Sequence, residues 1–197
     1  MVKIAVDIAL LPPTDVMDLV ISLNRKLTHT GKSNYSLNKK DWLPHITIAM
    51  GIIDTKNLPA IKKELSELFE RYPPITISFH DIKNTLNDDD EWSSILLVKK
   101  NNGLQELHEN IMSVMKKYFS YNATIKMFYA PPTLKRLSPY WKLGYPKTKT
   151  YENYLPHLTL GKGKSPIIKL RKTFKSRRLA LCHLGKGSTC RKILCEL

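Results

Sequence analysis

Histidine and threonine stand two residues apart at two places in the chain, within almost identical segments. The segment LPHITIAMG contains His45 and Thr47, and the segment LPHLTLGKG contains His157 and Thr159. Near neutral pH one imidazole can accept a proton while a second, protonated imidazole donates one. A threonine hydroxyl beside each ring can hold an oxygen of the reacting group through a hydrogen bond. These four side chains are suited to in-line displacement at phosphorus without a metal ion.

Each copy alternates polar and apolar residues in the manner of a half-buried strand. Residues two apart on a strand share a face, so the histidine and threonine of each copy should lie together on an open face. Ile46 and Ile48 of the first copy, and Leu158 and Leu160 of the second, should point into a core. The proline before each histidine suits the start or the edge of a sheet strand, because it cannot donate a backbone hydrogen bond.

The repetition of the motif is the main argument for a catalytic role. A single His-x-Thr carries little information, because a lone histidine on a strand is most often structural. Two copies inside a matched nine-residue segment, 112 positions apart, favour catalysis over coincidence. The histidines at positions 29, 80 and 108 have no such context, and we expect His29, His80 and His108 to be structural.

A different set of potential ligands lies near the C-terminus, namely Cys182, His183, Cys190 and Cys195. Their spacing lacks the paired cysteine knuckles of a structural zinc site, so we expect no metal and no other cofactor. Three cysteines are an odd number, which argues against a disulfide framework and favours a reducing, cytoplasmic location. No apolar run approaches the ~20 residues of a membrane span. We expect a monomer with no membrane contact.

Hydrophobic periodicity predicts alternating helices and strands around the two motifs. Helices are expected at 14–27, 57–69 and 104–115, and further strands at 2–10, 75–79, 93–98 and 122–129. A closing hairpin should join strands near 179–184 and 191–197. This order predicts an α+β fold with antiparallel sheets, arranged as two lobes of a single domain over residues 1–197.

Charge is distributed unevenly along the chain. Residues 1–98 carry a net charge of −2, whereas residues 99–197 carry +17. Such asymmetry favours a polyanionic partner that binds mainly to the second half. A merely soluble basic surface is the alternative that composition leaves open.

A long connection rich in Pro, Lys and Tyr occupies residues 130–154, directly before the second motif. Long loops in compact domains are often functional, and aromatic rings interleaved with lysines suit a base and its phosphate. We expect Trp141 or one of the neighbouring tyrosines to stack a base, and four cations to attract the anion. The candidates are Tyr140, Trp141, Tyr145, Lys135, Arg136, Lys142 and Lys162. The alternative is that the aromatic side chains only anchor the connection to the core.

Paired P-H-[IL]-T-[IL] strands, one in each half of the chain, resemble the two-histidine (2H) phosphoesterase superfamily and its 2′-5′ RNA ligase-like and cyclic phosphodiesterase branch. The resemblance spans the chain and implies a bilobal α+β fold whose motifs face each other across a central cleft. It implies that His45 and His157 are the catalytic histidines, with Thr47 and Thr159 anchoring the phosphate. Lys162 lies where members often place a basic residue after the second motif.

The same resemblance implies metal-independent hydrolysis or transfer at 2′,3′-cyclic or 2′-5′ phosphodiester bonds of RNA or (oligo)nucleotides. A hydrolase that degrades cyclic oligonucleotide signals is an alternative within this class. A non-catalytic RNA-binding module that uses the basic second half is an alternative from another class. The enzyme hypothesis accounts for both His-x-Thr copies, whereas the binding-module hypothesis accounts only for the charge.

Overall fold

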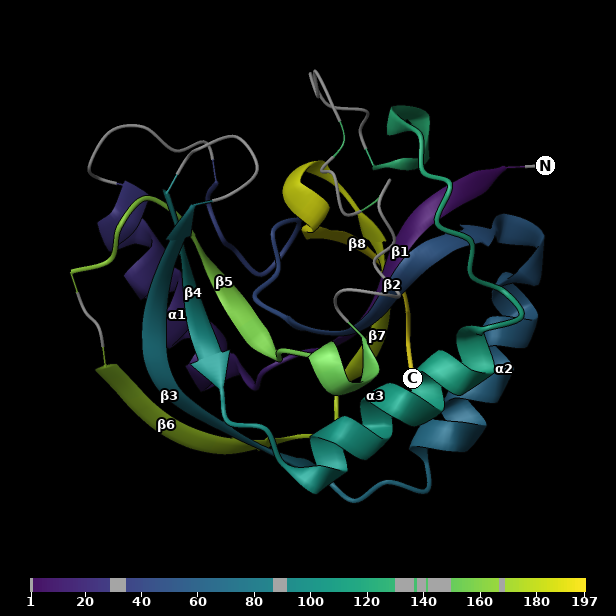
Figure 1. Ribbon diagram of the computed structural model, residues 1–197, viewed down its shortest axis with the longest axis horizontal. Coiled ribbons are helices and arrows are strands. Elements are labelled where there is room, and N and C mark those ends of the chain that lie inside the picture. Colours follow the sequence, from purple (N-terminus) through teal and green to yellow (C-terminus); the bar gives the residue numbers. More distant parts are fainter. Residues whose placement is uncertain are drawn as a thin grey trace.

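The computed structural model describes residues 2–28, 35–86, 92–129, 137, 141, 150–166 and 169–197. Within these residues the chain forms two four-stranded antiparallel sheets and three α-helices (Figure 1). The predicted α+β class with two antiparallel lobes is therefore confirmed.

Sheet A has the strand order β2-β1-β7-β8, and sheet B has the order β5-β4-β3-β6. The strands of sheet A are β1 (Lys3–Leu10), β2 (Ile46–Asp54), β7 (Leu179–Leu184) and β8 (Cys190–Glu196). The strands of sheet B are β3 (Ile75–Leu86), β4 (Trp92–Val98), β5 (His157–Lys162) and β6 (Lys169–Ser176). The helices are α1 (Thr14–Thr28), α2 (Leu58–Phe69) and α3 (Asn102–Met115). Four short 3₁₀ turns are η1 (Thr55–Asn57), η2 (Ile125–Met127), η3 (Tyr151–Asn153) and η4 (Lys186–Ser188).

The two His-x-Thr strands are the terminal strands of their sheets. β2 ends the order of sheet A, β5 ends the order of sheet B, and the two strands contact each other. Pro44 and Pro156 precede them, in agreement with the expectation that a proline marks the start or the edge of a strand. The fold thus brings together two motifs that are 112 residues apart in the chain.

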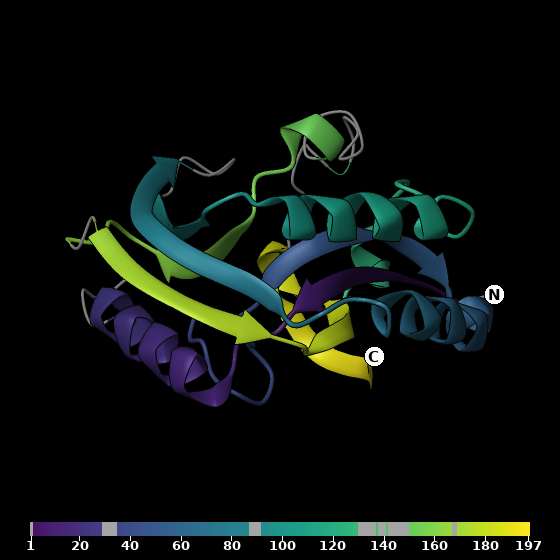
Figure 2. The same ribbon diagram turned by 90° about the horizontal axis from the view of Figure 1, so that it is seen from below.

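One hydrophobic core joins the two lobes. It combines inward residues of both sheets with the apolar faces of all three helices, including Val6, Leu65, Ile77 and Leu158. α1 covers one face of sheet B and contacts β5, as Figure 2 shows. α2 and α3 contact each other, and α3 also contacts β2 and β3. None of the described helices is long and apolar enough to cross a membrane.

One local prediction was wrong, and one strand was not predicted. Residues 122–129, expected to form a strand, contain η2 and otherwise irregular backbone. Phe128 packs there on Met50 and Ile52, so this segment crosses the face of sheet A and does not extend an edge. Residues 169–176, for which the sequence pattern predicted no strand, form β6. Their charges conceal an alternation in which Leu170 and Phe174 face the core.

Candidate functional site

The local pattern of the two motifs is largely as predicted. Ile46 and Ile48 are fully buried, and so are Leu158 and Leu160. In the second motif the histidine and the threonine are both half-buried, as is the threonine of the first motif. His45 is the exception, because only 9% of it is exposed. The expectation that it lies on an open face is therefore wrong.

Both catalytic candidates have the same tautomer-fixing hydrogen bond. Nδ1 of His45 donates to the carbonyl of Leu43 at 2.7 Å, and Nδ1 of His157 donates to the carbonyl of Leu155 at 2.9 Å. A carbonyl oxygen can only accept, so Nδ1 carries the proton in each neutral ring. Nε2 is therefore the atom that accepts or donates a proton in both motifs.

His108 of α3 and Tyr154 connect the two motifs. Nδ1 of His108 donates to the carbonyl of Ile48 at 2.6 Å, and its Nε2 accepts the backbone N–H of Tyr151 at 2.8 Å. The ring stacks on Tyr154 with centroids 4.1 Å apart, and the Tyr154 hydroxyl donates to the carbonyl of Thr47 at 3.0 Å. The segment leading into the second motif is thus tied to the first. The structural role expected of His108 is confirmed, whereas His29 lies outside the described residues.

Asp7 of β1 belongs to the site, although the sequence did not single it out. It is fully buried, and its Oδ2 accepts a hydrogen bond from the Thr47 hydroxyl at 2.7 Å. The same Oδ2 lies 3.4 Å from Nε2 of His45 and 3.9 Å from Sγ of Cys190. Its other oxygen, Oδ1, has no hydrogen-bond partner within the described part of the chain. The sequence signal that could have identified Asp7 was a single acidic residue within the segment 4–10, which is otherwise apolar.

Burial shifts the proton affinities of this pair in opposite directions. It raises the pKa of Asp7 to about 7, against the lowering effect of the hydrogen bonds from Thr47 and Cys190. Burial lowers the pKa of His45 to about 4, with the hydrogen bond to Leu43 acting in the opposite sense. The charge of His157 lowers the pKa of His45 further, which means that the two imidazoles influence each other across the site.

Asp7, His45 and Cys190 are also the one group within the described ranges that brings three potential metal ligands together, with ligand atoms within 4.8 Å of one another. The separations of their atoms are those of hydrogen-bonded and ion-paired side chains, and the Thr47 hydroxyl already occupies the carboxylate oxygen. Burial holds the pKa of the Cys190 thiol well above its usual value, which opposes the thiolate that a metal needs. We therefore describe these residues as a buried polar cluster.

A register shift in β5 brings Lys162 to the same side of sheet B as Thr159. Thr159 lies opposite Ile95 and Lys162 opposite Ser93, with an extra residue between the two pairs. Directly opposed residues point to the same face, as do Ser93 and Ile95. Without this β-bulge, Lys162 would point toward the core. The predicted basic position after the second motif thus lies on the same face as His157. The β-bulge that places it there could not be predicted from the alternation of polar and apolar residues.

Asn24 of α1 holds this bulge in place. Its Nδ2 donates to the carbonyls of Leu160 at 2.7 Å and Tyr35 at 3.0 Å, and its Oδ1 accepts the backbone N–H of Leu37 at 2.9 Å. Gly161 has a φ of +146°, and a Cβ there would lie 2.7 Å from Asn24 Nδ2. A glycine is required at this position because both the backbone angle and the close side chain exclude a Cβ.

A row of directly opposed residues crosses sheet B from the second motif. His157 lies opposite Leu97, Leu97 opposite Asp81, and Asp81 opposite Lys169. Three strand spacings separate β5 from β6, about 14 Å in all. The face that carries His157 therefore continues to β6 without passing through the core.

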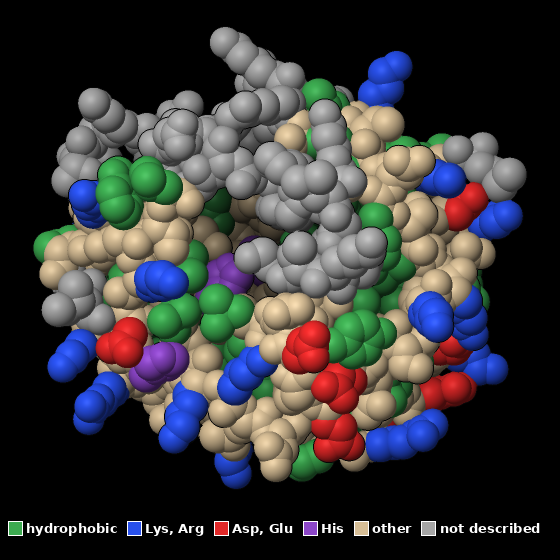
Figure 3. All heavy atoms as spheres, viewed as in Figure 1, with side chains coloured by type: hydrophobic (Ala, Val, Ile, Leu, Met, Phe, Trp, Pro, Cys, Tyr) green, Lys and Arg blue, Asp and Glu red, His purple; other side chains and the backbone are tan. Residues whose placement is uncertain are grey.

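Exposed basic residues lie along this face at its far side. Lys169, Arg171 and Lys175 alternate with half-buried residues of β6, and Lys83 follows on β3 in the row of Thr159. Lys172 points the other way, where it pairs with Asp15 of α1 at 3.3 Å. Figure 3 shows this side of the molecule, with a histidine side chain in a hollow near its centre and Lys and Arg side chains along its left and lower margins. Lys83 was missed because it lies in the acidic half of the sequence.

Trp141 does not have the predicted open ring. Only 2% of it is exposed, its ring packs edge-on against Phe128 with centroids 5.6 Å apart, and Nε1 donates to the Ser188 hydroxyl at 3.2 Å. The base-stacking role is therefore corrected in favour of anchoring the connection to the core. The other candidates in this connection, Tyr140, Tyr145, Lys135, Arg136 and Lys142, lie outside the described residues.

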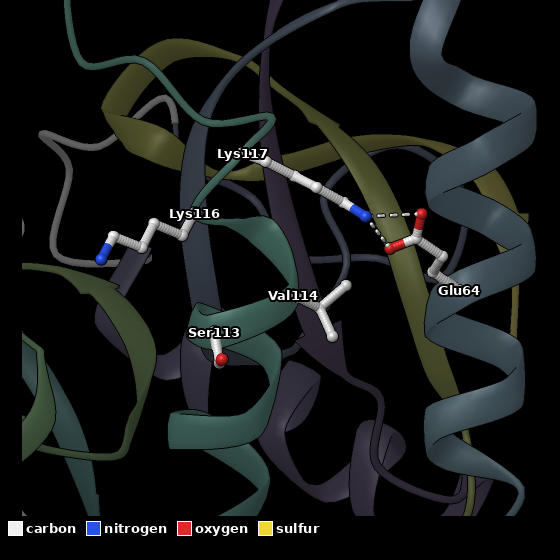
Figure 4. Close-up of a pocket in the computed structure, with 5 residues that line it drawn as sticks. All are labelled: Glu64, Ser113, Val114, Lys116 and Lys117. Carbon is white, nitrogen blue, oxygen red and sulfur yellow. Dashed lines mark hydrogen bonds and ion pairs between the residues drawn. The ribbon is translucent and has the colours of Figure 1, made fainter.

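A separate surface pocket of about 500 Å³ lies between α2 and α3, away from both motifs (Figure 4). Lys117 and Glu64 form an ion pair across it at 2.7 Å, whereas Lys116 points away from this pair. Its lining contains neither of the motif histidines, and its central charges neutralise each other. The pocket therefore offers no proton-transfer chemistry comparable with that of the paired motifs.

The fold and the paired motifs define a class of protein with two antiparallel lobes and one His-x-Thr strand at the terminal position of each sheet. A family model described as the 2′-5′ RNA ligase superfamily matches residues 21–182. The chain belongs to this superfamily, which confirms the expected 2H phosphoesterase class. No curated protein matches the sequence.

Solved structures with a similar fold include E. coli LigT complexed with ATP, which is 16% identical with a TM-score of 0.56. E. coli LigT complexed with 3′-AMP is also 16% identical, with a TM-score of 0.54. A structure described as a phosphoesterase is 13% identical with a TM-score of 0.51. Each comparison covers 99% of this chain and 97% of the other. At these identities the likeness supports the fold.

Proposed function

We propose that the protein is a metal-independent phosphodiesterase acting on 2′,3′-cyclic or 2′-5′ phosphodiester bonds of RNA or (oligo)nucleotides. The observation that carries the proposal is the matched orientation of the two imidazoles. In each motif the carbonyl two residues before the histidine holds the proton of Nδ1, which leaves Nε2 for proton transfer. The contact between β2 and β5 supports placing both rings at one phosphate.

In this mechanism the two histidines divide the proton transfers. One Nε2 accepts the proton of an attacking water or hydroxyl, and the other donates a proton to the leaving oxygen. Each role is typically worth ~10²–10⁴-fold in rate. Thr159 holds a non-bridging phosphate oxygen, and Thr47 does so only when its hydroxyl turns from Asp7 to the substrate. Lys162 adds a positive charge on the face of the second motif.

Nucleotide substrates are supported by the relatives and by the surface charge. E. coli LigT has been crystallised with ATP and with 3′-AMP, both of which carry a phosphate on a ribose. The exposed cations Lys83, Lys169, Arg171 and Lys175 of this chain share a sheet face with the second motif. Such a row fits a substrate with more than one phosphate, because each contact neutralises one backbone charge.

The test is a substrate panel in the presence of EDTA. It contains a 2′,3′-cyclic nucleotide, a 2′-5′ dinucleotide, the matched 3′-5′ dinucleotide and a cyclic oligonucleotide, with products separated by chromatography. We expect turnover of the first or second substrate, unchanged by EDTA. The double variant His45→Ala/His157→Ala serves as the negative control.

Each unexpected outcome has a defined meaning. Loss of turnover in EDTA, restored by zinc or magnesium, would contradict the metal-independent mechanism. Exclusive turnover of the cyclic oligonucleotide would favour the signal-degrading alternative. RNA binding without turnover of any substrate would favour the binding-module alternative.

A further inference from the structure

In the first motif a carboxylate oxygen faces an imidazole nitrogen, and without a shared proton both atoms could only accept hydrogen bonds. Because Nδ1 of His45 donates to Leu43, the neutral ring presents a lone pair at Nε2. Oδ2 of Asp7 faces this lone pair at 3.4 Å. An ionised carboxylate would also present only lone pairs, so the two atoms would repel each other. A proton on one of the two atoms turns this repulsion into a hydrogen bond.

We propose that Asp7 and His45 share one proton between Oδ2 and Nε2, which makes the first motif the general acid and leaves His157 as the general base. This assignment rests on the proposed phosphodiesterase function. Asp7 acts through His45 and does not need to contact the substrate, so its role is to position and supply the proton.

The surroundings of Asp7 favour the neutral, protonated carboxyl. The side chain is fully buried, and an ionised carboxylate there needs cations or several donors to offset its desolvation. The structure provides one short donor, the Thr47 hydroxyl at 2.7 Å, and a weak one, the Cys190 thiol at 3.9 Å. Oδ1 has no hydrogen-bond partner in the part of the chain that is described. A protonated carboxyl tolerates this, with Oδ1 as carbonyl and Oδ2 as hydroxyl.

Among the residues that the structure describes, the other titratable groups around Asp7 do not supply a compensating positive charge. Cys182 lies opposite Asp7 on β7, and the Cys190 thiol faces it from β8. Burial raises the pKa of the Tyr154 hydroxyl, and the charge of the nearby Asp7 raises it further. These groups are neutral or potentially anionic, so the proton is left to the pair formed with His45. The rise in the pKa of Asp7 to about 7 and the fall in that of His45 to about 4 agree with this.

The second motif has the same tautomer in a different setting. Nδ1 of His157 donates to Leu155 at 2.9 Å, and the side chain is half-buried whereas His45 is buried. Because the His157 ring is in contact with solvent, a proton that Nε2 accepts can be passed on to water, which the burial of His45 does not allow. His157 is therefore suited to accept a proton, whereas the first motif already holds one.

The proton and bond changes balance in this scheme. The attacking oxygen forms its bond to phosphorus as its proton moves to Nε2 of His157. The bond from phosphorus to the leaving ribose oxygen breaks, and that oxygen takes the shared proton from Nε2 of His45, whose single N–H is then directed to both Oδ2 of Asp7 and the leaving oxygen in a three-centre hydrogen bond. Asp7 is then a carboxylate beside a neutral His45. The proton on His157 passes to solvent, and one from solvent restores the Asp7–His45 pair.

The test compares two leaving groups in Asp7→Asn. A 2′-5′ dinucleotide releases a ribose hydroxyl that needs a proton, whereas the 2′-(4-nitrophenyl phosphate) of the same nucleoside releases 4-nitrophenolate, which does not. We expect Asp7→Asn to lower kcat on the dinucleotide by ~10²-fold or more and on the nitrophenyl ester by less than ~10-fold. His157→Ala should lower kcat on both substrates to a similar degree. Asp15→Asn, the same change at an exposed site on α1, should leave both rates within about twofold.

Equal losses on the two substrates in Asp7→Asn would show that Asp7 is only structural and would overturn the proposal. The proposal would also fail if His157→Ala, rather than Asp7→Asn, were rescued by the good leaving group. These outcomes are read from proteins whose folding has been checked by circular dichroism.

A second measurement does not depend on activity. The ¹⁵N chemical shift of His45 Nε2, followed against pH, reports whether that nitrogen accepts a proton. We expect the midpoint of the titration in Asp7→Asn to differ from wild type by more than about one pH unit, and identical midpoints would contradict proton sharing. If wild type hydrolyses neither ester, the proposed function fails, and the titration still decides whether Asp7 and His45 share a proton.

Discussion

The two His-x-Thr motifs contain the same residue types, yet the fold gives them different surroundings. In the first motif His45 is buried, and the Thr47 hydroxyl donates to the buried carboxyl of Asp7. In the second motif His157 and Thr159 are half-buried on a sheet face that leads to exposed cations. A repeat in sequence is therefore no guarantee of equivalent chemistry. Burial and one acidic neighbour are enough to place two identical side chains in different environments for proton transfer.

The largest expected effect comes from removing either imidazole. His45→Ala and His157→Ala should each lower kcat/KM by several orders of magnitude, because each ring carries one of the two proton transfers. Initial rates on the best substrate of the panel measure this, with circular dichroism as the check on folding. His183→Ala is the matched control, since Nε2 of His183 donates to the carbonyl of Met127 and the residue lies outside both motifs. A near-normal rate in the double motif variant would refute the assignment.

Substitution of the two threonines should show a smaller difference between the motifs, in the binding of the phosphate. Thr159→Val removes a hydroxyl proposed to hold the phosphate, and a hydrogen bond to a charged oxygen is worth ~1.5–3 kcal/mol. Thr47→Val removes a hydroxyl whose proton is directed to Asp7, so its direct effect on phosphate binding should be smaller. We expect KM to rise ~10-fold or more in Thr159→Val and less in Thr47→Val. The opposite order, measured by steady-state kinetics, would mean that the Thr47 hydroxyl turns to the substrate.

The difference in stability between Asp7→Asn and wild type should change with pH. The folded-state pKa of Asp7 is raised from 3.8 to about 7, so its protonated form stabilises the fold and that stability is lost as pH rises between these values. Each pH unit in this range lowers the free energy of unfolding by about 1.4 kcal/mol, and a loss of ~1 kcal/mol lowers Tm by ~2–4 °C in a chain of this size. Asparagine does not ionise and escapes this loss. Asp7→Asn should therefore gain several degrees of Tm on wild type between pH 5 and pH 8.

Thermal denaturation at a series of pH values tests this directly. Asp15→Asn, whose carboxylate is exposed beside Lys172, should track wild type within about a degree across the same range. A difference in Tm between wild type and Asp7→Asn that stays constant with pH would show that Asp7 is already ionised at pH 5.

The smallest effect is expected from the basic face of sheet B. Removing the three exposed cations of β6 in Lys169→Ala/Arg171→Ala/Lys175→Ala should raise KM for a long RNA several-fold. It should also weaken the dependence of KM on salt, because fewer counterions are released on binding. A dinucleotide, with one linking phosphate, should change less. The control Lys62→Ala/Lys63→Ala/Lys116→Ala removes the same charge from α2 and the end of α3, on the other side of the molecule (Figure 1). Equal effects of the two triple variants would mean that only net charge matters.

Local patterns in the sequence were sufficient for most of the fold. The alternation around His45 and His157 predicted both strands and their core-facing residues, and helical periodicity found α1, α2 and α3. These patterns depend only on residues a few positions apart, so they can be recognised without knowledge of the tertiary structure. The prediction of a strand at 122–129 was wrong because the conformation of this segment depends on tertiary packing that a local pattern does not contain. Its apolar residues pack on the face of sheet A, and an alternating pattern does not distinguish such packing from pairing at an edge.

The sequence by itself determined the four residues of the paired motifs and the class of chemistry that they suit. Only the tertiary structure decided how those residues differ. Asp7 approaches Thr47 across 40 positions of sequence, and Asn24 reaches the carbonyl of Leu160 across 136. Proton affinity depends on desolvation and on neighbouring charges, and both are set by residues that are distant in the chain. The fold therefore buries a carboxyl beside one histidine and leaves the other half-exposed on a sheet face.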